Sequence, residues 1–263
     1  MNPLELVGKR VPFLRWSFLR LLFSFKKLTT EWQVGDGREE ALAHYVVTRA
    51  RAGDVDDVIR TIDEFCARRS FMIHVSEEKG AILDAAVRRT SPKRVLELGT
   101  YCGYSALRIV RLLDADCRLV SVEFNPANAD IARRIWDHAG VGSRVAVVVG
   151  TLGDGDVTLK RLEVEHGFAP GSVDFVFIDH AKDAYLPDLH RVVDRDWLHA
   201  GSVVVADNVK FPGAPEYRAY MKSAEGRTWR SIEHATHETL IRDVVLESRY
   251  LGNNGVKPSP SRP

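Results

Sequence analysis

A doubly wound α/β fold is the fold class that the sequence predicts, and three observations lead to it. Helical and strand patterns alternate regularly from Gly37 onward. The expected strands are short, continuous apolar runs, and strands of that kind are buried on both faces of a parallel sheet. The chain has 263 residues, of which 45% are hydrophobic, which is enough to fill the core of one α/β domain.

The first expected elements are three helices, at 37–50, 54–69 and 76–90, whose apolar residues recur at i, i+3 and i+4 spacing. Helical stretches such as 126–139 and 185–195 then separate the strands. Five strands are expected, at 94–98, 118–123, 144–150, 173–179 and 202–207. This βαβαβ order predicts a Rossmann-like, doubly wound sheet with extra N-terminal helices.

Two further strands are expected near the C-terminus. Residues 239–247 alternate like a half-exposed strand and can pair with residues 228–234 as an antiparallel hairpin. The sheet would then be seven-stranded and mostly parallel. Residues 37–251 form the expected folded domain, and residues 252–263 have the composition of a disordered tail.

Residues 1–36 form an N-terminal extension, in which residues 11–27 are both apolar and positively charged. Arg15 and Arg20 interrupt this stretch, so it is not a continuous membrane span, and it lacks the layout of a signal peptide. Its apolar and polar residues fall on opposite faces of a helix. Two interpretations stay open: a helix that packs on its own domain or on a partner subunit of a homo-oligomer, and a helix that lies on a membrane surface.

Charge and cysteine content exclude several classes of protein. The 37 Lys and Arg residues nearly balance the 36 Asp and Glu residues, so the sequence indicates no nucleic-acid partner. The three cysteines have no CxxC spacing and predict neither a disulfide framework nor a zinc site. A reducing compartment fits this composition. We therefore expect a cytoplasmic protein, with peripheral membrane contact through residues 11–27 as the open alternative.

Acidic residues near the ends of two expected strands indicate an adenosine-type ligand. The turn "ELGTYCG" begins at Glu97, and its glycines allow backbone to approach a ligand closely. It lacks the GxGxxG pattern of nicotinamide and flavin folds. Glu123 ends the next strand, where a carboxylate can accept hydrogen bonds from ribose hydroxyls. Without a cradle for pyrophosphate, an acidic turn favours a positively charged ligand such as S-adenosylmethionine.

A second group of polar residues follows two other apolar strands. Asp179 ends one of them, and Asp207 and Asn208 end the next. The carboxyl ends of parallel strands meet at one edge of a sheet, where ligands bind. Two carboxylates and an amide offer the hard oxygen atoms that Mg²⁺ prefers. The sequence therefore predicts a magnesium site.

These residues resemble the magnesium-dependent catechol O-methyltransferases, a family of class I S-adenosylmethionine-dependent methyltransferases. The resemblance spans roughly residues 39–250 and rests on "LELGTYCGYSALRIVRLL", "FIDHAKDAYLPD" and "VVADNVKFPGAPEY". It implies that Asp179, Asp207 and Asn208 bind Mg²⁺ and that Lys182 is the general base. It also implies that the folded domain is the methyltransferase domain.

The resemblance further implies the residues that surround the cofactor and the acceptor. Those expected at the cofactor are Ile73, Val75, Glu97, Gly99, Tyr101, Tyr104, Ser105, Glu123, Thr151, Asp179 and His180. Those expected at the catechol-type acceptor are Phe71, Lys182, Asn208 and Pro212. Glu238 is the candidate for the late catalytic glutamate that holds the second catechol hydroxyl, although a gapless alignment puts Leu240 there.

This chain departs from the family pattern in three places. Ala181 stands where the family usually has a tryptophan over the adenine, and Leu152 and Gly153 replace a Ser-Gln pair that commonly contacts it. Lys210 and Phe211 alter the loop beside the acceptor, so the acceptor could be larger or more acidic than a simple catecholamine.

The residues themselves are consistent with methyl transfer. Two adjacent catechol oxygens could chelate the metal, which would lower the pKa of the hydroxyl. Lys182 lies three residues after Asp179 and could take the hydroxyl proton. Two other interpretations are kept. One is an oxidoreductase, which the missing GxGxxG pattern disfavours. The other is a cofactor-binding protein without catalysis that acts as a membrane-associated or partner-binding module.

Overall fold

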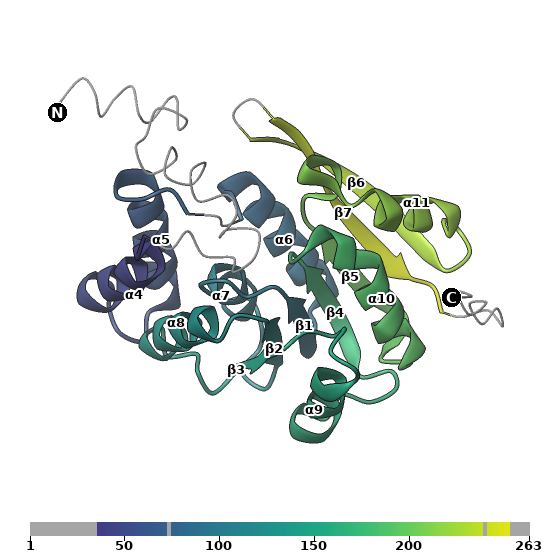
Figure 1. Ribbon diagram of the computed structural model, residues 1–263, viewed down its shortest axis with the longest axis horizontal. Coiled ribbons are helices and arrows are strands. Elements are labelled where there is room, and N and C mark those ends of the chain that lie inside the picture. The colour runs from purple at the N-terminus through teal and green to yellow at the C-terminus, as the bar shows by residue number, and fades with distance from the viewer. Residues whose placement is uncertain (1–35, 73–74, 239–240, 253–263) are drawn as a thin grey trace.

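One seven-stranded sheet organises the molecule, which we describe at residues 36–72, 75–238 and 241–252 of a computed structural model. The strands lie in the order β3-β2-β1-β4-β5-β7-β6 (Figure 1). Their bounds are β1 Arg94–Leu98, β2 Arg118–Glu123, β3 Val145–Val149, β4 Val173–Ile178, β5 Leu198–Ala206, β6 Trp229–Glu238 and β7 Ile241–Tyr250. The first five are parallel, and β7 is antiparallel to both β5 and β6. The predicted sheet and its C-terminal hairpin are confirmed.

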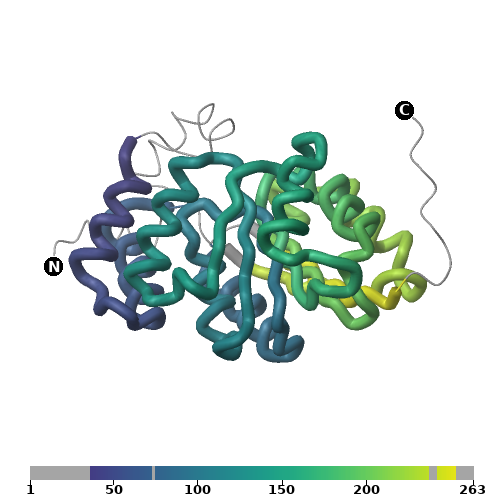
Figure 2. The backbone as a smooth tube through the Cα atoms, turned by 90° about the horizontal axis from the view of Figure 1, so that it is seen from below, coloured from purple at the N-terminus to yellow at the C-terminus, as the bar shows by residue number. Residues whose placement is uncertain are grey.

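Helices cover both faces of the sheet. The N-terminal helices are α4 Arg38–Arg49, α5 Val55–Arg68 and α6 Glu77–Thr90, followed by α7 Tyr104–Val110 and α8 Pro126–His138. The helices of the second half are α9 Val157–His166, α10 Tyr185–Asp194 and α11 Pro215–Ser223. Helices α6, α7 and α8 share one core cluster with the sheet, and α9, α10 and α11 share another. Helices α4 and α5 pack on α8 and α7, and they lie at the end of the molecule opposite the C-terminal hairpin (Figure 2).

Local chemistry explains where several helices begin. Asp54 accepts a hydrogen bond from the amide of Asp57 at the start of α5, and Ser76 does the same for Lys79 at the start of α6. Such side chains satisfy amides that have no partner within the helix. Asn125 caps α8, and the proline that follows it suits the first helical position.

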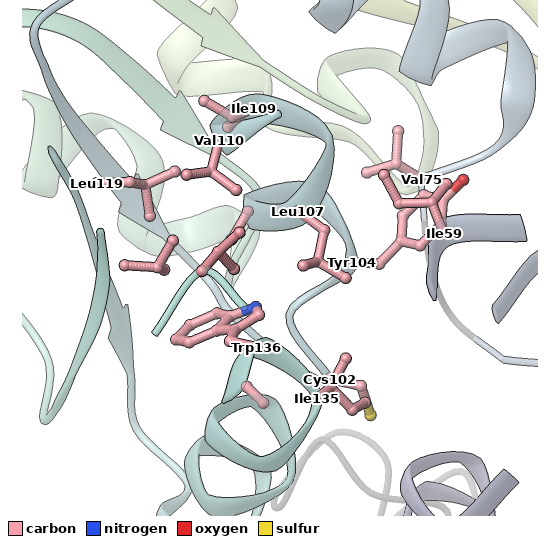
Figure 3. Packing of buried hydrophobic residues seen from close by; sticks show 14 of the residues in the cluster. Ile59, Val75, Cys102, Tyr104, Leu107, Ile109, Val110, Leu119, Ile135 and Trp136 are labelled. Atoms are coloured by element: carbon pink, nitrogen blue, oxygen red, sulfur yellow. The ribbon is translucent and has the colours of Figure 1, made fainter. Parts of the chain in front are cut away.

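The turn between β1 and α7 packs directly on α8 (Figure 3). The indole nitrogen of Trp136 donates a hydrogen bond to the carbonyl oxygen of Gly103 over 2.9 Å. Gly103 has a φ of +81°, and a Cβ atom there would lie 2.4 Å from that nitrogen. Glycine is therefore required by both its backbone angle and the close approach of Trp136.

Some predicted features lie outside the described residues or differ in length. The amphipathic stretch 11–27 and the tail from 253 onward lie outside the described residues. Strand β5 begins at Leu198, earlier than the predicted 202, and the hairpin strands are longer than expected because their pairing extends from Trp229 with Tyr250 to Glu238 with Ile241. Within the described part of the chain, no helix combines the length and apolarity needed to cross a membrane.

Candidate active site

The turn after β1 brings the predicted cofactor site and the predicted metal site to the same edge of the sheet. Gly99 has a φ of +101°, and a Cβ atom on it would lie 2.2 Å from the carbonyl oxygen of Asp179. Its amide donates to the carbonyl oxygen of Val122 over 3.0 Å. Gly99 therefore lets the end of β1 lie against the end of β4.

Glu97 is fully buried at the end of β1. Its carboxylate accepts hydrogen bonds from the hydroxyls of Ser105, over 2.6 Å, and Ser121. Burial raises the pKa of Glu97 to about 7, against the effect of these two hydroxyls. The site thus contains a carboxylate whose charge is costly and which favours a cationic ligand group.

Glu123 fastens the same turn to the end of β2. One carboxylate oxygen accepts from the backbone amides of Thr100 and Tyr101, over 3.1 and 2.8 Å, and the other accepts from the amide of Asn125 over 2.9 Å. Burial raises the pKa of Glu123, although these amides oppose the shift. A carboxylate oxygen has more than one acceptor direction, so Glu123 could also accept from a ligand hydroxyl.

The two tyrosines of the turn anchor it to the outer helices. The hydroxyl of Tyr101 donates to Glu39 of α4 over 2.9 Å, and that of Tyr104 donates to Asp63 of α5 over 2.7 Å. The side chain of Tyr104 lies near Val75 in the core (Figure 3). The hydroxyls of Tyr101 and Tyr104 therefore already donate to Glu39 and Asp63. The predicted contacts of these tyrosines with the cofactor would use other atoms.

Two of the three predicted metal ligands contact the amine of Lys182. Its Nζ lies 3.0 Å from Asp179 Oδ1 and 3.3 Å from Asn208 Oδ1. Asp207 is buried, and burial together with the charge of Asp179 raises its pKa to about 7. Two neighbouring carboxylates and an amide oxygen form a donor set that fits a hard divalent cation, which would offset their repulsion.

Tyr185 of α10 connects this group, although no pattern in the sequence indicated that role. Lys182 Nζ donates to its hydroxyl over 2.5 Å, and that hydroxyl donates to the backbone carbonyl of Asp207 over 2.9 Å. Burial raises the pKa of Tyr185, so the phenol stays protonated and can donate. Tyr185 therefore fixes the position of the Lys182 amine relative to β5.

Lys79 and Asp243 were also missed. Lys79 Nζ lies 3.0 Å from Asp207 Oδ1 and 2.7 Å from Asp243 Oδ2, and all three side chains are buried. Burial alone would raise the pKa of Asp243, but hydrogen bonds from Lys79 and from the amides of Phe211 and Val244 hold it below its ordinary value. A lysine on the buried face of α6, one turn before Leu83, was the available signal.

His180 and Thr151 flank the place expected for the adenine. His180 Nε2 lies 2.8 Å from Asp188 Oδ2, and its ring stacks on Tyr185. Its Nδ1 is buried and has no hydrogen-bond partner among the residues that the structure describes. Thr151 follows β3 and is exposed.

The residues predicted beside the acceptor lie in two segments. Phe71 is half-buried, and its carbonyl oxygen accepts from Arg38 over 2.5 Å. Pro212 is exposed in the short turn η3 (Val209–Gly213), next to Phe211. Val75 is buried in the core, Ile73 lies outside the described residues, and only the backbone of Glu238 is described.

A different acidic group lies at the opposite edge of the sheet. Asp114, Asp116 and Cys117 precede β2, and their potential ligand atoms lie within 4.8 Å of one another. Both carboxylates are exposed, and exposed acidic groups are common without any ion. This group lies before the first residue of β2, whereas the candidate site lies at the carboxyl ends of the strands.

Comparison with known proteins decides the family. A family model described as O-methyltransferase matches residues 52–224. The chain belongs to the O-methyltransferase family. A probable O-methyltransferase of Mycobacterium tuberculosis is 58% identical over 230 residues, which cover 86% of this chain and 98% of that protein. Catechol O-methyltransferase B of Danio rerio is 41% identical and covers 82% of this chain and 80% of its own.

The resemblance to catechol O-methyltransferases extends along the whole methyltransferase. Catechol O-methyltransferase of Bos taurus is 36% identical over 98% of this chain and 95% of its own. Among solved structures, the O-methyltransferase from Bacillus cereus in complex with SAH superposes with a TM-score of 0.59 at 21% identity, over 87% of this chain and 97% of that chain. The protein is thus an O-methyltransferase with an S-adenosylmethionine-binding fold.

Proposed function

We propose that this O-methyltransferase uses S-adenosylmethionine and Mg²⁺ to methylate one hydroxyl of a catechol-type acceptor. One observation carries the proposal: the oxygens of Asp179 and Asn208 converge on the Lys182 amine at the same sheet edge as the glycine turn. The kinship with proteins named catechol O-methyltransferase supports the acceptor class.

The cofactor would lie along the turn after β1. Glu97 offers its carboxylate to the positively charged amino group of the methionine part, while Ser105 and Ser121 hold that carboxylate in place. Glu123 offers its remaining acceptor directions to the ribose hydroxyls. The adenine would then reach the ends of β3 and β4, where Thr151 and His180 lie.

Asp179, Asp207 and Asn208 would hold the metal ion. Bound there, Mg²⁺ would orient both catechol oxygens and favour loss of the hydroxyl proton. The turn η3 follows β5 and contains Phe211 and Pro212. These two apolar side chains are suited to pack against an aromatic ring. The acceptor would therefore meet charged and apolar walls that lie close together in the chain.

Lys182 would complete the reaction as the general base. With its amine neutral, Nζ would accept the hydroxyl proton of the acceptor. S-adenosylmethionine, held by Glu97 and Glu123, would supply the methyl group to the acceptor oxygen and would leave as S-adenosylhomocysteine, with the electron pair of the broken carbon–sulfur bond on sulfur. Holding both reactants as near-attack neighbours can supply on the order of 7–11 kcal/mol of the barrier reduction.

A methyl-transfer assay tests this proposal. The full chain is incubated with S-adenosylmethionine and a panel of catechols, matched monophenols serve as controls, and each reaction is run with Mg²⁺ and with a chelator. We expect methylated catechols only with the metal. Methylation that survives the chelator, or equal use of monophenols, would contradict the mechanism.

A cofactor-binding protein without catalysis is the second candidate, and the small residues at the adenine position favour it. Ala181 and Gly153 offer little surface for stacking. The same experiment separates the two functions, because this candidate predicts calorimetric binding of S-adenosylmethionine without turnover of any catechol. The convergence of Lys182 with Asp179 and Asn208 favours the enzyme.

A further inference from the structure

A buried ion pair lies beside the predicted metal ligands. Lys79 comes from α6 and Asp243 from β7, and their side chains are each 2% exposed. Burying two charges costs several kcal/mol for each ion unless the pair and its remaining hydrogen bonds compensate. The other hydrogen bonds of Asp243 indicate the role of this buried ion pair.

Asp243 sets the orientation of Asn208. Its Oδ2 lies 2.8 Å from Asn208 Nδ2, and an ionised carboxylate can only accept hydrogen bonds. The amide group must therefore turn its nitrogen toward Asp243 and its oxygen the other way, where Oδ1 lies 3.3 Å from Lys182 Nζ. Only the amide oxygen can bind a hard cation, so the contact with Asp243 presents the correct atom.

The other oxygen of the same carboxylate holds the acceptor turn. Asp243 Oδ1 accepts from the backbone amides of Phe211, over 2.8 Å, and Lys210, over 3.3 Å. These amides belong to the turn that follows Asn208 directly. One side chain on β7 therefore fixes both a metal ligand and the backbone beside the acceptor.

Lys79 extends the arrangement to Asp207, the predicted ligand that directly follows β5. Its amine lies between Asp243 and Asp207, at 2.7 and 3.0 Å. The charge of Asp243 balances that of Lys79, which would otherwise offset the carboxylate of Asp207. A lone ammonium at this position would compete with a divalent cation for that carboxylate.

We propose that Asp243 is a positioning residue of the methyltransferase site, which orients the Asn208 amide, fixes the acceptor turn and neutralises Lys79 beside Asp207. The proposal rests on the Mg²⁺-dependent function proposed above. The single and double variants should therefore differ in their affinity for the cation. Loss of Asp243 alone leaves the Lys79 charge unbalanced and weakens cation binding strongly, whereas loss of both charges removes the competitor and leaves only the loss of orientation.

The test measures cation affinity without turnover. Mn²⁺, which accepts the same oxygen ligands as Mg²⁺, is titrated into the full chain with S-adenosylhomocysteine and no acceptor, and free Mn²⁺ is followed by electron paramagnetic resonance. The variants are Asp243→Asn and the double variant Lys79→Met with Asp243→Asn. Asp84→Asn is the matched control, because Asp84 is a buried carboxylate of α6 that pairs with Arg108 and Arg111 instead.

We expect Asp243→Asn to weaken Mn²⁺ binding by about tenfold or more, as loss of groups that orient metal ligands does elsewhere. The double variant should recover part of that loss yet stay at least about threefold weaker than the unmodified chain, and Asp84→Asn should stay within about twofold. Affinity for S-adenosylhomocysteine, measured by calorimetry, should hardly change in any variant.

Two outcomes overturn the proposal: Asp243→Asn within about twofold of the unmodified chain, or a double variant no tighter than Asp243→Asn. If Asp243→Asn does not fold, the double variant decides, because an affinity equal to that of the unmodified chain would exclude a role in orientation. Failure of the underlying function looks different, since the unmodified chain itself would then bind no Mn²⁺.

Discussion

A Cβ atom on Gly99 would lie 2.2 Å from the carbonyl oxygen of Asp179, closer than a real side-chain carbon can come. Gly99 belongs to the turn predicted to bind the cofactor, and Asp179 is the first predicted metal ligand. The distance between the two proposed sites is therefore limited by the contact of the Gly99 backbone with the Asp179 backbone. This contact would let the proposed methyl donor and a metal-bound acceptor lie side by side.

Gly99→Ala tests this relationship. We expect the substitution to lower the free energy of unfolding by at least about 3 kcal/mol, because the new methyl group adds a clash to the strain of about 1–3 kcal/mol at positive φ. Chemical denaturation measures the loss. Gly155→Ala is the control, since Gly155 also has a positive φ but nothing lies within 4 Å of its added Cβ. Equal losses in the two variants would show that the contact with Asp179 is not restrictive.

The strands were predictable because burial on both faces makes them continuous apolar runs. The start of β5 was missed, since His199, Ala200 and Gly201 interrupt that run although the backbone is already extended. The convergence of Asp179, Asp207 and Asn208 at one edge followed from the parallel order of the strands. Their roles, like those of the other site residues, stay predictions.

The contact between Lys79 and Asp243 could not be predicted. A lysine among the apolar residues of a helix indicates that it has a buried acidic partner, but not which residue that partner is. The partner lies 164 residues later in the chain. Asp243 stands on a strand that pairs antiparallel with β5, and only the register of that pairing brings it to Asn208. A pattern of residue types does not contain this register.

Cofactor affinity should depend on pH through Glu97. The pKa of this carboxyl is raised to about 7, so the group becomes anionic, and can pair with the amino group of the cofactor, only as the pH rises through that value. We expect binding of S-adenosylhomocysteine, measured by calorimetry, to tighten between about pH 6 and pH 8. In Glu97→Gln, binding should be weaker, and the part of the pH dependence due to Glu97 should be absent. An unchanged pH profile in that variant would assign the effect to another group, such as Glu123.

The free protein should show the opposite dependence from the same carboxyl. The pKa of Glu97 rises from its ordinary value of 4.5, expected in the unfolded chain, to about 7 in the folded chain. Folding therefore favours the protonated form. Its contribution to the free energy of unfolding is therefore full below about pH 4.5 and is lost as the pH rises through about 7. Between pH 5 and pH 7, Glu97→Gln should stay more constant in stability than the unmodified chain when no ligand is present.

Tyr185→Phe should lower turnover while leaving the fold intact. The phenylalanine ring keeps the stacking with His180 but removes the hydroxyl that connects Lys182 with the Asp207 backbone. Misplacement of a general base costs part of its contribution, so we expect kcat to fall by about tenfold or more. Steady-state kinetics with a catechol and circular dichroism give the two measurements. A drop in melting temperature with unchanged kcat would show a purely structural role.

Lys182→Met should abolish most of the proton transfer, because methionine keeps much of the side-chain length but has no basic nitrogen. General-base catalysis contributes roughly 10² to 10⁴ in rate, so kcat should fall by about that factor. Binding of S-adenosylhomocysteine should stay within about threefold, since Lys182 contacts the predicted metal ligands Asp179 and Asn208 rather than Glu97 or Glu123. The exposed Lys160 provides the control variant Lys160→Met. Parallel losses of turnover and cofactor affinity would mean that Lys182 supports the local structure, whereas an isolated fall in kcat would assign it to the chemical step.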